Sequence, residues 1–327
     1  MNIPLTLQNA IEEEASKHGS RVVTQAREDL TERYRHRQPK PNGFMTTDAE
    51  RCAYLAARLP ATYAVIRHVL LEVQSRLPNC HFESLLDLGA GPGTAMWAAA
   101  EIFPSLSQID LIEQDQSLAL LGQRLASYSE HPATLTAQWH IENMELSPSF
   151  TSHDLVVLSY SVGEITPASL LPLIEASWQA AAKCLVVIEP GTPAGFERIR
   201  LIREHLIRLG GYLAAPCPHA LACPMAGGDW CHFSQRVERS SLHRHIKGGT
   251  LGHEDEKFSY MAVSRTPCEL PNARILRHPQ KHSGHIKLTL CTPEGVKDEI
   301  VSKRTPEDYK QARKAEWGSP INFSLDT

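Results

Sequence analysis

The sequence predicts an α/β protein built on a doubly wound parallel sheet, and three observations support this. A strand-like run ends in a glycine-rich turn that opens a helix, over residues 84–103. Strand and helix patterns then alternate to about residue 210, as they do in βαβ units. The runs 154–159 and 184–189 are continuously apolar, which is typical of buried parallel strands.

Residues 1–80 are expected to form a helical N-terminal domain. Apolar residues recur at helical spacing over 11–34, and a break rich in proline and glycine follows at 38–43. The run Thr47-Asp48-Ala49-Glu50 has the pattern of a capping box and predicts the start of the next helix. A further helix is expected to end near Leu77.

Residues 81–211 are expected to form the sheet domain. The sequence predicts strands at 84–88, 108–113, 135–140, 154–159 and 184–189, with helices near 94–103, 115–127, 167–182 and 194–209.

Beyond residue 211 the pattern changes. Residues 212–256 are rich in Cys, His, Gly and Pro, and they are too many for an idle loop. Residues 257–327 are predicted to add a last core strand and a basic β extension. Within it we expect a strand at 257–263, a hairpin of 285–290 with 296–301, and a helix over 306–315.

The formal net charge of −4 is spread unevenly. Residues 1–199 hold 14 basic and 23 acidic residues, whereas 200–327 hold 19 and 14, with nine of the 16 histidines. A basic C-terminal part on an acidic body suggests a surface for a polyanion, and a solvated surface of mixed charge is the alternative. No apolar run is long enough to span a membrane and no signal-peptide pattern opens the chain. A cytoplasmic protein with no membrane partner is therefore expected, with cysteines reduced or metal-bound.

The turn from Asp87 to Gly93 has the strongest functional pattern. Three glycines in five residues allow a tight backbone that approaches a ligand closely. A dinucleotide site favours G-x-G-x-x-G, but here the spacing is G-x-G-x-G, and Asp87 would repel a pyrophosphate. An acid instead attracts the ammonium of S-adenosylmethionine, and Glu113, at the end of the next strand, is placed for its ribose hydroxyls. The turn resembles the first motif of class I methyltransferases; a nucleotide site and a turn without ligand are the alternatives. The predicted cofactor residues are Asp87, Gly89, Ala90, Gly91, Gly93 and Glu113.

Three cysteines, Cys217, Cys223 and Cys231, follow a C-x5-C-x7-C spacing. A metal would explain how this weakly apolar segment becomes ordered, because ligation contributes directly to folding. Thiolates select zinc or an iron–sulfur cluster, and ordinary buried cysteines are the alternative. The candidates for a fourth ligand are Cys291, Cys268, His219 and His232, whereas Cys52 and Cys184 are expected in the core.

The runs Pro216-Cys217-Pro218-His219 and Asp229-Trp230-Cys231-His232-Phe233 resemble the methyltransferase-like proteins of the small ribosomal subunit. The resemblance covers roughly residues 50–305. It implies a class I methyltransferase fold and association with the small subunit, or its assembly intermediates, and with its RNA. It also implies a 4Fe-4S cluster on Cys217, Cys223 and Cys231, with Cys291 preferred as fourth ligand over Cys268 and zinc as the alternative metal.

The resemblance does not assign a catalytic residue. The run Ser159 to Glu164 lacks the Asp/Asn-Pro-Pro-Tyr/Phe motif of base-amino methyltransferases, although Ser159, Tyr160 and Glu164 are placed to contact a substrate or to cap locally. Two functions stay open: a methyltransferase acting on small-subunit ribosomal RNA, and a catalytically inactive RNA-binding assembly factor. The residues expected to contact phosphates are Arg236, Arg239, Arg244, Lys247, Arg274, Arg277, Lys281 and Lys287, with His243 and His245 among them.

Overall fold

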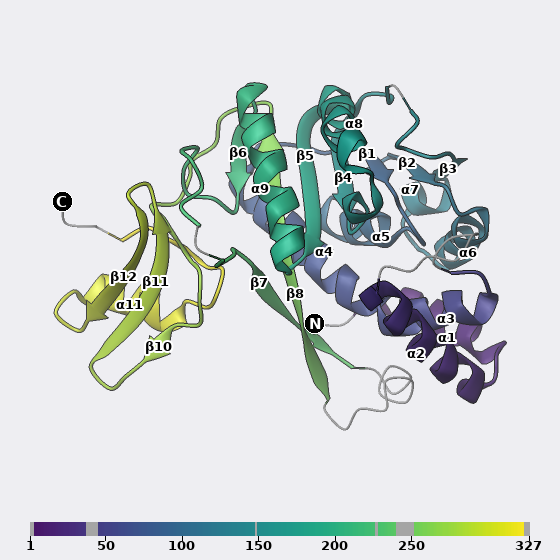
Figure 1. The fold of residues 1–327 in the computed structure, drawn as a ribbon, viewed down its shortest axis with the longest axis horizontal. Helices are drawn as coiled ribbons and strands as arrows, with labels where there is room; N and C mark the ends of the chain where they lie inside the picture. Colours follow the sequence, from purple (N-terminus) through teal and green to yellow (C-terminus); the bar gives the residue numbers. More distant parts are fainter. Residues whose placement is uncertain (1–2, 37–44, 148, 226–227, 240–251, 324–327) are drawn as a thin grey trace. The chain divides into compact units, whose positions relative to one another are not determined.

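The structure is a computed structural model that describes residues 3–36, 45–147, 149–225, 228–239 and 252–323 (Figure 1). The chain forms two compact units, each assembled from three stretches of sequence. The first contains Met1–Leu70, His81–Ser147 and Gln235–Glu256; the second contains Leu71–Cys80, Pro148–Ser234 and Lys257–Thr327.

The first unit opens with helices, as predicted: α1 (Leu5–Ser16), α2 (Ser20–His36), α3 (Asp48–Ala57) and the start of α4 (Leu59–Arg76). The capping box before α3 is confirmed, because the Thr47 side chain accepts the Glu50 N–H and the Glu50 side chain accepts the Thr47 N–H. The Glu50 carboxylate also pairs with Arg33 at 2.6 Å, which ties α2 to α3.

Three parallel strands follow in the first unit, in the order β3-β2-β1. They are β1 (Ser84–Leu88), β2 (Gln108–Glu113) and β3 (Gln138–Ile141), with helices α5 (Thr94–Ile102), α6 (Gln116–Ala126) and α7 (Pro132–Leu135). The first two strands have the predicted bounds. The third starts three residues later than predicted because a short helix, with Pro132 at its favourable first position, occupies 132–135.

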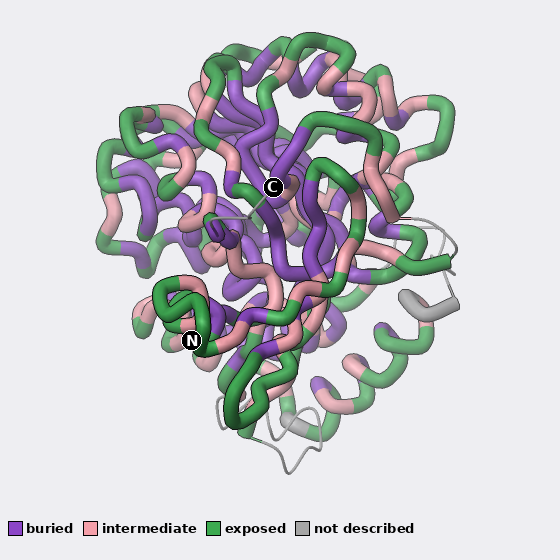
Figure 2. The backbone as a smooth tube through the Cα atoms, turned by 90° about the vertical axis from the view of Figure 1, so that its left-hand side faces the viewer, coloured by how far each residue is buried: buried purple, intermediate pink, exposed green. Residues whose placement is uncertain are grey.

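The second unit contains β4 (His153–Ser159) and β5 (Ala181–Pro190), which run parallel and are mostly buried. The short turn η1 (Val162–Glu164) and helix α8 (Pro167–Ala180) connect them, and α9 (Pro193–Arg208) leads on to β6 (Tyr212–Ala215). Strand β8 (His253–Ser264) lies antiparallel between β5 and β6. Buried residues gather in the interior of the fold, and exposed residues lie along its outer turns (Figure 2).

The chain ends in a small sheet with its own apolar core, which includes Ile275, Leu288, Leu290 and Ala312. The predicted hairpin and helix are present as β11 (His285–Thr292), β12 (Gly295–Ser302) and α11 (Pro306–Lys314). Not predicted were β6, β7 (Phe233–Glu238), β9 (Ala273–Ile275), β10 (Gln280–Lys281) and β13 (Pro320–Ile321). Most of these strands are too short to show a periodicity of two residues.

The predicted α/β class is confirmed. A parallel β1-β2-β3 set with a glycine turn, and a reversed strand between β5 and β6, are typical of class I methyltransferase-like folds. The sequence-based domain boundaries at residues 80, 211 and 256 stay a prediction.

Candidate cofactor site and cysteine pocket

The glycine turn after β1 has the conformation that its residue types allow. Gly89, Gly91 and Gly93 have φ angles of 71°, 57° and 80°, in the left-handed region that glycine adopts without a steric penalty. The N–H groups of Gly89 and Ala90 both donate to the Ile112 carbonyl, at 2.9 and 3.0 Å. The turn is therefore held against the carboxyl end of β2.

Glu113, the last residue of β2, closes the other side of this turn. One carboxylate oxygen accepts the Gly91 N–H and the other accepts the Asp115 N–H, both at 2.8 Å. Burial raises the pKa of Glu113, and these backbone hydrogen bonds oppose the rise. Each oxygen keeps a second lone pair, so the carboxylate can still accept a hydroxyl.

Asp87, at the end of β1, is completely buried. Within the described part of the chain neither of its carboxyl oxygens has a hydrogen-bond partner. Burial, and then the nearby Glu113, raise the pKa of Asp87 to about 8. An unpartnered buried acid is unfavourable, and a cationic ligand would restore its charge. The group fits an ammonium and would oppose a pyrophosphate.

The carboxyl end of β4 carries a strained residue. Tyr160 has φ of 58° and, among described residues other than glycine, is the single one with a positive φ. Such a conformation costs about 1–2 kcal/mol and marks candidate functional positions. Its N–H donates to the Ile188 carbonyl at 2.8 Å. Ser159 is half-buried beside it and Glu164 is exposed, but this geometry does not single out a catalytic group.

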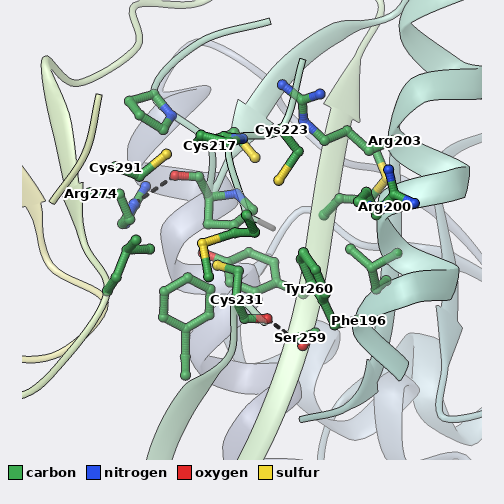
Figure 3. Close-up of a pocket in the computed structure, with 18 of the residues that line it drawn as sticks. Phe196, Arg200, Arg203, Cys217, Cys223, Cys231, Ser259, Tyr260, Arg274 and Cys291 are labelled. Carbon is green, nitrogen blue, oxygen red and sulfur yellow. Dashed lines mark hydrogen bonds between the residues drawn. The ribbon is translucent and has the colours of Figure 1, made fainter. Parts of the chain in front are cut away.

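Four cysteines line one pocket of the second unit, whose empty space of about 600 Å³ is partly open to solvent. Cys217 and Cys223 follow β6, Cys231 precedes β7, and Cys291 lies on β11. Their sulfur atoms face the same space (Figure 3).

The alternative fourth ligands lie in different surroundings. His219 also lines the pocket, with its Nε2 3.7 Å from the Cys291 sulfur. Cys268 is outside the pocket lining, and its thiol donates to the Leu213 carbonyl at 3.3 Å. His232 stacks on Trp230, with ring centroids 5.0 Å apart. Cys52 and Cys184 are buried in the core, as predicted.

The thiols of Cys223, Cys231 and Cys291 favour their neutral form while they are free, because burial raises the pKa of each. Burial, and then the neighbouring cysteines, raise the pKa of Cys291 to about 12. The same causes raise the pKa of Cys231 well above its usual value of 9. A metal would have to displace these protons, so its affinity should rise with pH. Over the described ranges, no three His, Cys, Asp or Glu side chains gather closely enough to hold a metal ion.

Two buried arginines, which the sequence did not identify as pocket residues, hold the backbone around the cysteines. Arg203 of α9 donates to the carbonyls of His219 and Leu221, at 2.7 and 2.8 Å. Arg274 of β9 donates to the Pro216 carbonyl at 2.6 Å and pairs with Glu72 at 2.8 Å. No local pattern could identify them, because their partners are up to 202 residues away along the chain.

Hydrogen bonds also tie Cys231 and its neighbour to the sheet of the second unit. Ser259 of β8 donates to the Cys231 carbonyl at 2.8 Å, and the Trp230 indole donates to the Gly191 carbonyl at 3.0 Å. The cysteine segment is therefore fixed mainly by long-range polar contacts.

The basic residues after the cysteines are already partnered where they are described. Arg236 pairs with Asp255 at 3.0 Å and Arg239 with Glu254 at 2.9 Å. Arg277 pairs with Asp229. The predicted contacts of Arg244, Lys247, His243 and His245 lie outside the described residues.

The glycine turn, the parallel strands and the reversed β8 define a class I methyltransferase-like protein. A family profile described as mitochondrial small ribosomal subunit Rsm22 matches residues 48–322. The chain belongs to this family, which confirms the resemblance noted in the sequence.

Curated relatives agree with the family. The chain is 27% identical over 291 residues to the mitochondrial ribosome assembly protein METTL17 of Homo sapiens, covering 83% of this chain and 62% of that protein. It is 24% identical to the mitochondrial Rsm22-cox11 tandem protein 2 of Schizosaccharomyces pombe, covering 83% and 43%. The chain thus spans less than two thirds of the length of these relatives.

Among solved structures, the magnesium protoporphyrin IX methyltransferase of Synechocystis PCC 6803 has a TM-score of 0.40 and 10% identity, covering 64% of this chain and 81% of that one. A TM-score of this size leaves the fold class to rest on the strand order and the family match.

The expected cytoplasmic location is wrong, because the matched family and both relatives are described as mitochondrial. Composition and the absence of a signal-peptide pattern do not distinguish these compartments. None of the helices described is both long and apolar enough to cross a bilayer.

The buried Asp87 gives a testable pH dependence. Its pKa in the folded protein is raised, so its contribution to stability is complete below the unfolded value near 4 and is lost as the pH rises through about 8. Replacing Asp87 by Asn removes the ionisable group and keeps its size. We expect D87N, without ligand, to raise the midpoint of thermal unfolding more at pH 8.5 than at pH 5. An equal effect at both pH values would contradict a raised pKa.

Proposed function

We propose that this chain binds S-adenosylmethionine at the glycine turn, holds an iron–sulfur cluster in the cysteine pocket, and associates with the small ribosomal subunit through its RNA. The observation that carries the cofactor assignment is the buried, unpartnered carboxyl of Asp87. Membership of the Rsm22 family supports the ribosomal part.

S-adenosylmethionine, when bound, supplies a methyl group on a sulfonium. Asp87 would hold its ammonium, and Glu113 would hold its ribose hydroxyls. The turn itself would carry no large side chain next to the cofactor, because it consists of Gly89, Ala90, Gly91 and Gly93. The backbone at Gly91 supports this role, because its φ of 57° is one that side chains rarely adopt, and among the described residues a Cβ there would have only Leu118 within 4 Å, at 3.9 Å. The space beside the turn is therefore left open by the protein itself.

The cysteine pocket offers four thiols, the ligand number of a cubane cluster, and the family resemblance favours a cluster over zinc. Tetrahedral zinc holds each sulfur at about 2.3 Å, and therefore holds the sulfurs about 3.8 Å from one another. The described side chains do not preform so tight a group. A cubane cluster spaces its thiolates more widely. Such a cluster would suit the common, largely apolar space that is faced by Cys217, Cys223, Cys231 and Cys291.

The C-terminal sheet offers free positive charge for RNA. Residues 270–323 contain ten Lys and Arg against six Asp and Glu. On α11, Lys310, Arg313 and Lys314 are exposed, and within the part of the chain described here they have no acidic partner. Their spacing of three and four residues puts them on one side of the helix. This surface suits a phosphate backbone better than Arg236 and Arg239, which are already paired with acids.

The cofactor site, the cysteine pocket and the basic surface are compatible both with methyl transfer and with a non-catalytic role in assembly. Conversion of S-adenosylmethionine to S-adenosylhomocysteine, measured on small-subunit RNA and on assembly intermediates, separates them. Turnover that depends on RNA supports the enzyme; binding of cofactor without turnover on either substrate supports the assembly factor.

Adding a methyl group at Gly91 should abolish cofactor binding. In the left-handed conformation an alanine costs about 1–2 kcal/mol, and its Cβ would stand where the ligand approaches. The matched control is Gly210→Ala, because Gly210 has φ of 81° and open space around it, beyond the end of α9. Calorimetric titration should show lost affinity for Gly91→Ala alone, with similar losses of stability. Equal affinities in the two variants would rule out the site.

Anaerobically purified protein should be brown, with absorption near ~400 nm, as a cluster on thiolates gives. Serine at Cys217, Cys223, Cys231 or Cys291 should remove the colour and most of the iron. Cys268→Ser is the control, because that thiol lies outside the pocket lining. Colourless protein containing zinc and no sulfide would refute the cluster, and bleaching by Cys268→Ser would refute the fourth ligand.

Neutralising the α11 surface should weaken RNA binding through salt-dependent contacts. Replacing Lys310, Arg313 and Lys314 together by Gln removes three potential phosphate contacts. For single-stranded RNA this should reduce the slope of log affinity against log salt by about 2. Arg236→Gln, whose charge Asp255 already neutralises, should leave the slope unchanged. Filter binding across a salt series provides the measurement; an unchanged slope in the triple variant means that this surface is only solvated.

A further inference from the structure

The cysteine pocket contains a buried positive charge that no acid among the described residues neutralises. Arg203 is only 3% exposed and lines the pocket together with the four cysteines. Its hydrogen bonds go to two backbone carbonyls, and its Nε has no partner. Within the described ranges, no carboxylate pairs with it.

The other pocket arginines differ from Arg203 in this respect. Arg200 is flanked by Glu197 and Glu204, at 2.5 and 3.3 Å. Arg274 pairs with Glu72 at 2.8 Å. Arg203 therefore differs from the other two arginines that line this pocket, because it has no ion pair with a described carboxylate.

An uncompensated guanidinium is costly to bury, because arginine does not lose its proton in proteins. A protonated thiol carries no charge and offers it no counter-charge. Four thiolates around an iron–sulfur core whose positive charge is smaller than theirs would leave a centre with net negative charge. Such a centre is the anion that the surroundings of Arg203 lack.

We propose, on the basis of the cluster proposed above, that Arg203 is the counter-charge of the thiolate-bound centre. One guanidinium nitrogen, Nη2, donates to the carbonyls of both His219 and Leu221, in the segment between Cys217 and Cys223. The side chain extends from α9 toward these cysteines (Figure 3). Arg203 thereby retains the cluster, and it stabilises the extra negative charge that the cluster acquires on reduction.

Two substitutions separate the charge from the hydrogen bonds. Arg203→Gln removes the charge and keeps an amide that can donate to a carbonyl. Arg203→Lys keeps the charge and replaces the planar guanidinium by an ammonium. Arg200→Gln is the matched control, because Arg200 lines the same pocket but its charge is already paired.

The experiment uses the full chain, reconstituted anaerobically with iron and sulfide. Three quantities are measured: iron and sulfide per chain, the rate at which a chelator removes the iron, and the reduction potential in a dithionite titration followed by electron paramagnetic resonance. Arg203→Gln should lose iron about 10- to 100-fold faster than wild type and should have a more negative potential. Arg203→Lys and Arg200→Gln should stay close to wild type in both.

Other outcomes distinguish this inference from the cluster itself. If the wild-type protein holds the cluster, and Arg203→Gln has the same rate of iron loss and the same reduction potential, the role of Arg203 is overturned while the cluster is supported. The role of Arg203 is also overturned if Arg203→Gln only lowers the thermal stability of the apo form and leaves the rate of iron loss and the reduction potential unchanged. If wild type retains zinc and no iron, the cluster is refuted, and weaker zinc binding by Arg203→Gln than by Arg203→Lys still supports the counter-charge. Wild type that binds neither metal overturns both.

Discussion

The second unit depends on how the segment between β6 and β7 is held in place. This segment carries three of the pocket cysteines but contributes few fully buried apolar side chains. Long-range polar contacts from Arg203, Arg274, Ser259 and Trp230 hold its backbone instead. Apolar burial normally stabilises a chain segment without specifying its partners. Here directional hydrogen bonds to carbonyls determine where the cysteines lie.

The first unit shows a comparable compromise at the glycine turn. Strand β1 carries Asp87 next to its last residue, and the oxygens of this buried acid lack partners in the described part of the chain. A hydrophobic residue there would stabilise the fold more. Binding sites commonly contain residues that lower the stability of the unliganded protein. The conformations of Gly89, Gly91 and Gly93 add a backbone that only glycine adopts without strain.

The distribution of charge looks different once the strands pair. In the sequence, the positive residues after the cysteines form a basic run. In the structure, β8 carries Glu254 and Asp255, which neutralise Arg239 and Arg236. Part of the exposed positive charge that has no ion pair in the described C-terminal sheet lies instead on α11, at Lys310, Arg313 and Lys314. Net charge therefore predicts a basic surface without locating it, whereas strand pairing determines which basic residues are already neutralised.

The sequence by itself determined the elements whose signals are local. The bounds of β1 and β2, the capping box of α3, the hairpin of β11 and β12, and the glycine turn all follow from hydrophobic periodicity and turn chemistry. The three clustered cysteines and the acids Asp87 and Glu113 were also evident from spacing alone.

Only the tertiary structure decided what joins these elements. It placed Cys291 in the pocket and left Cys268 outside, brought Arg203 and Arg274 to the cysteine segment, and formed strands of two to four residues that show no period. Each of these outcomes depends on contacts between residues far apart in sequence. Local propensity carries no information about such contacts, because their free energy arises only when the chain has packed.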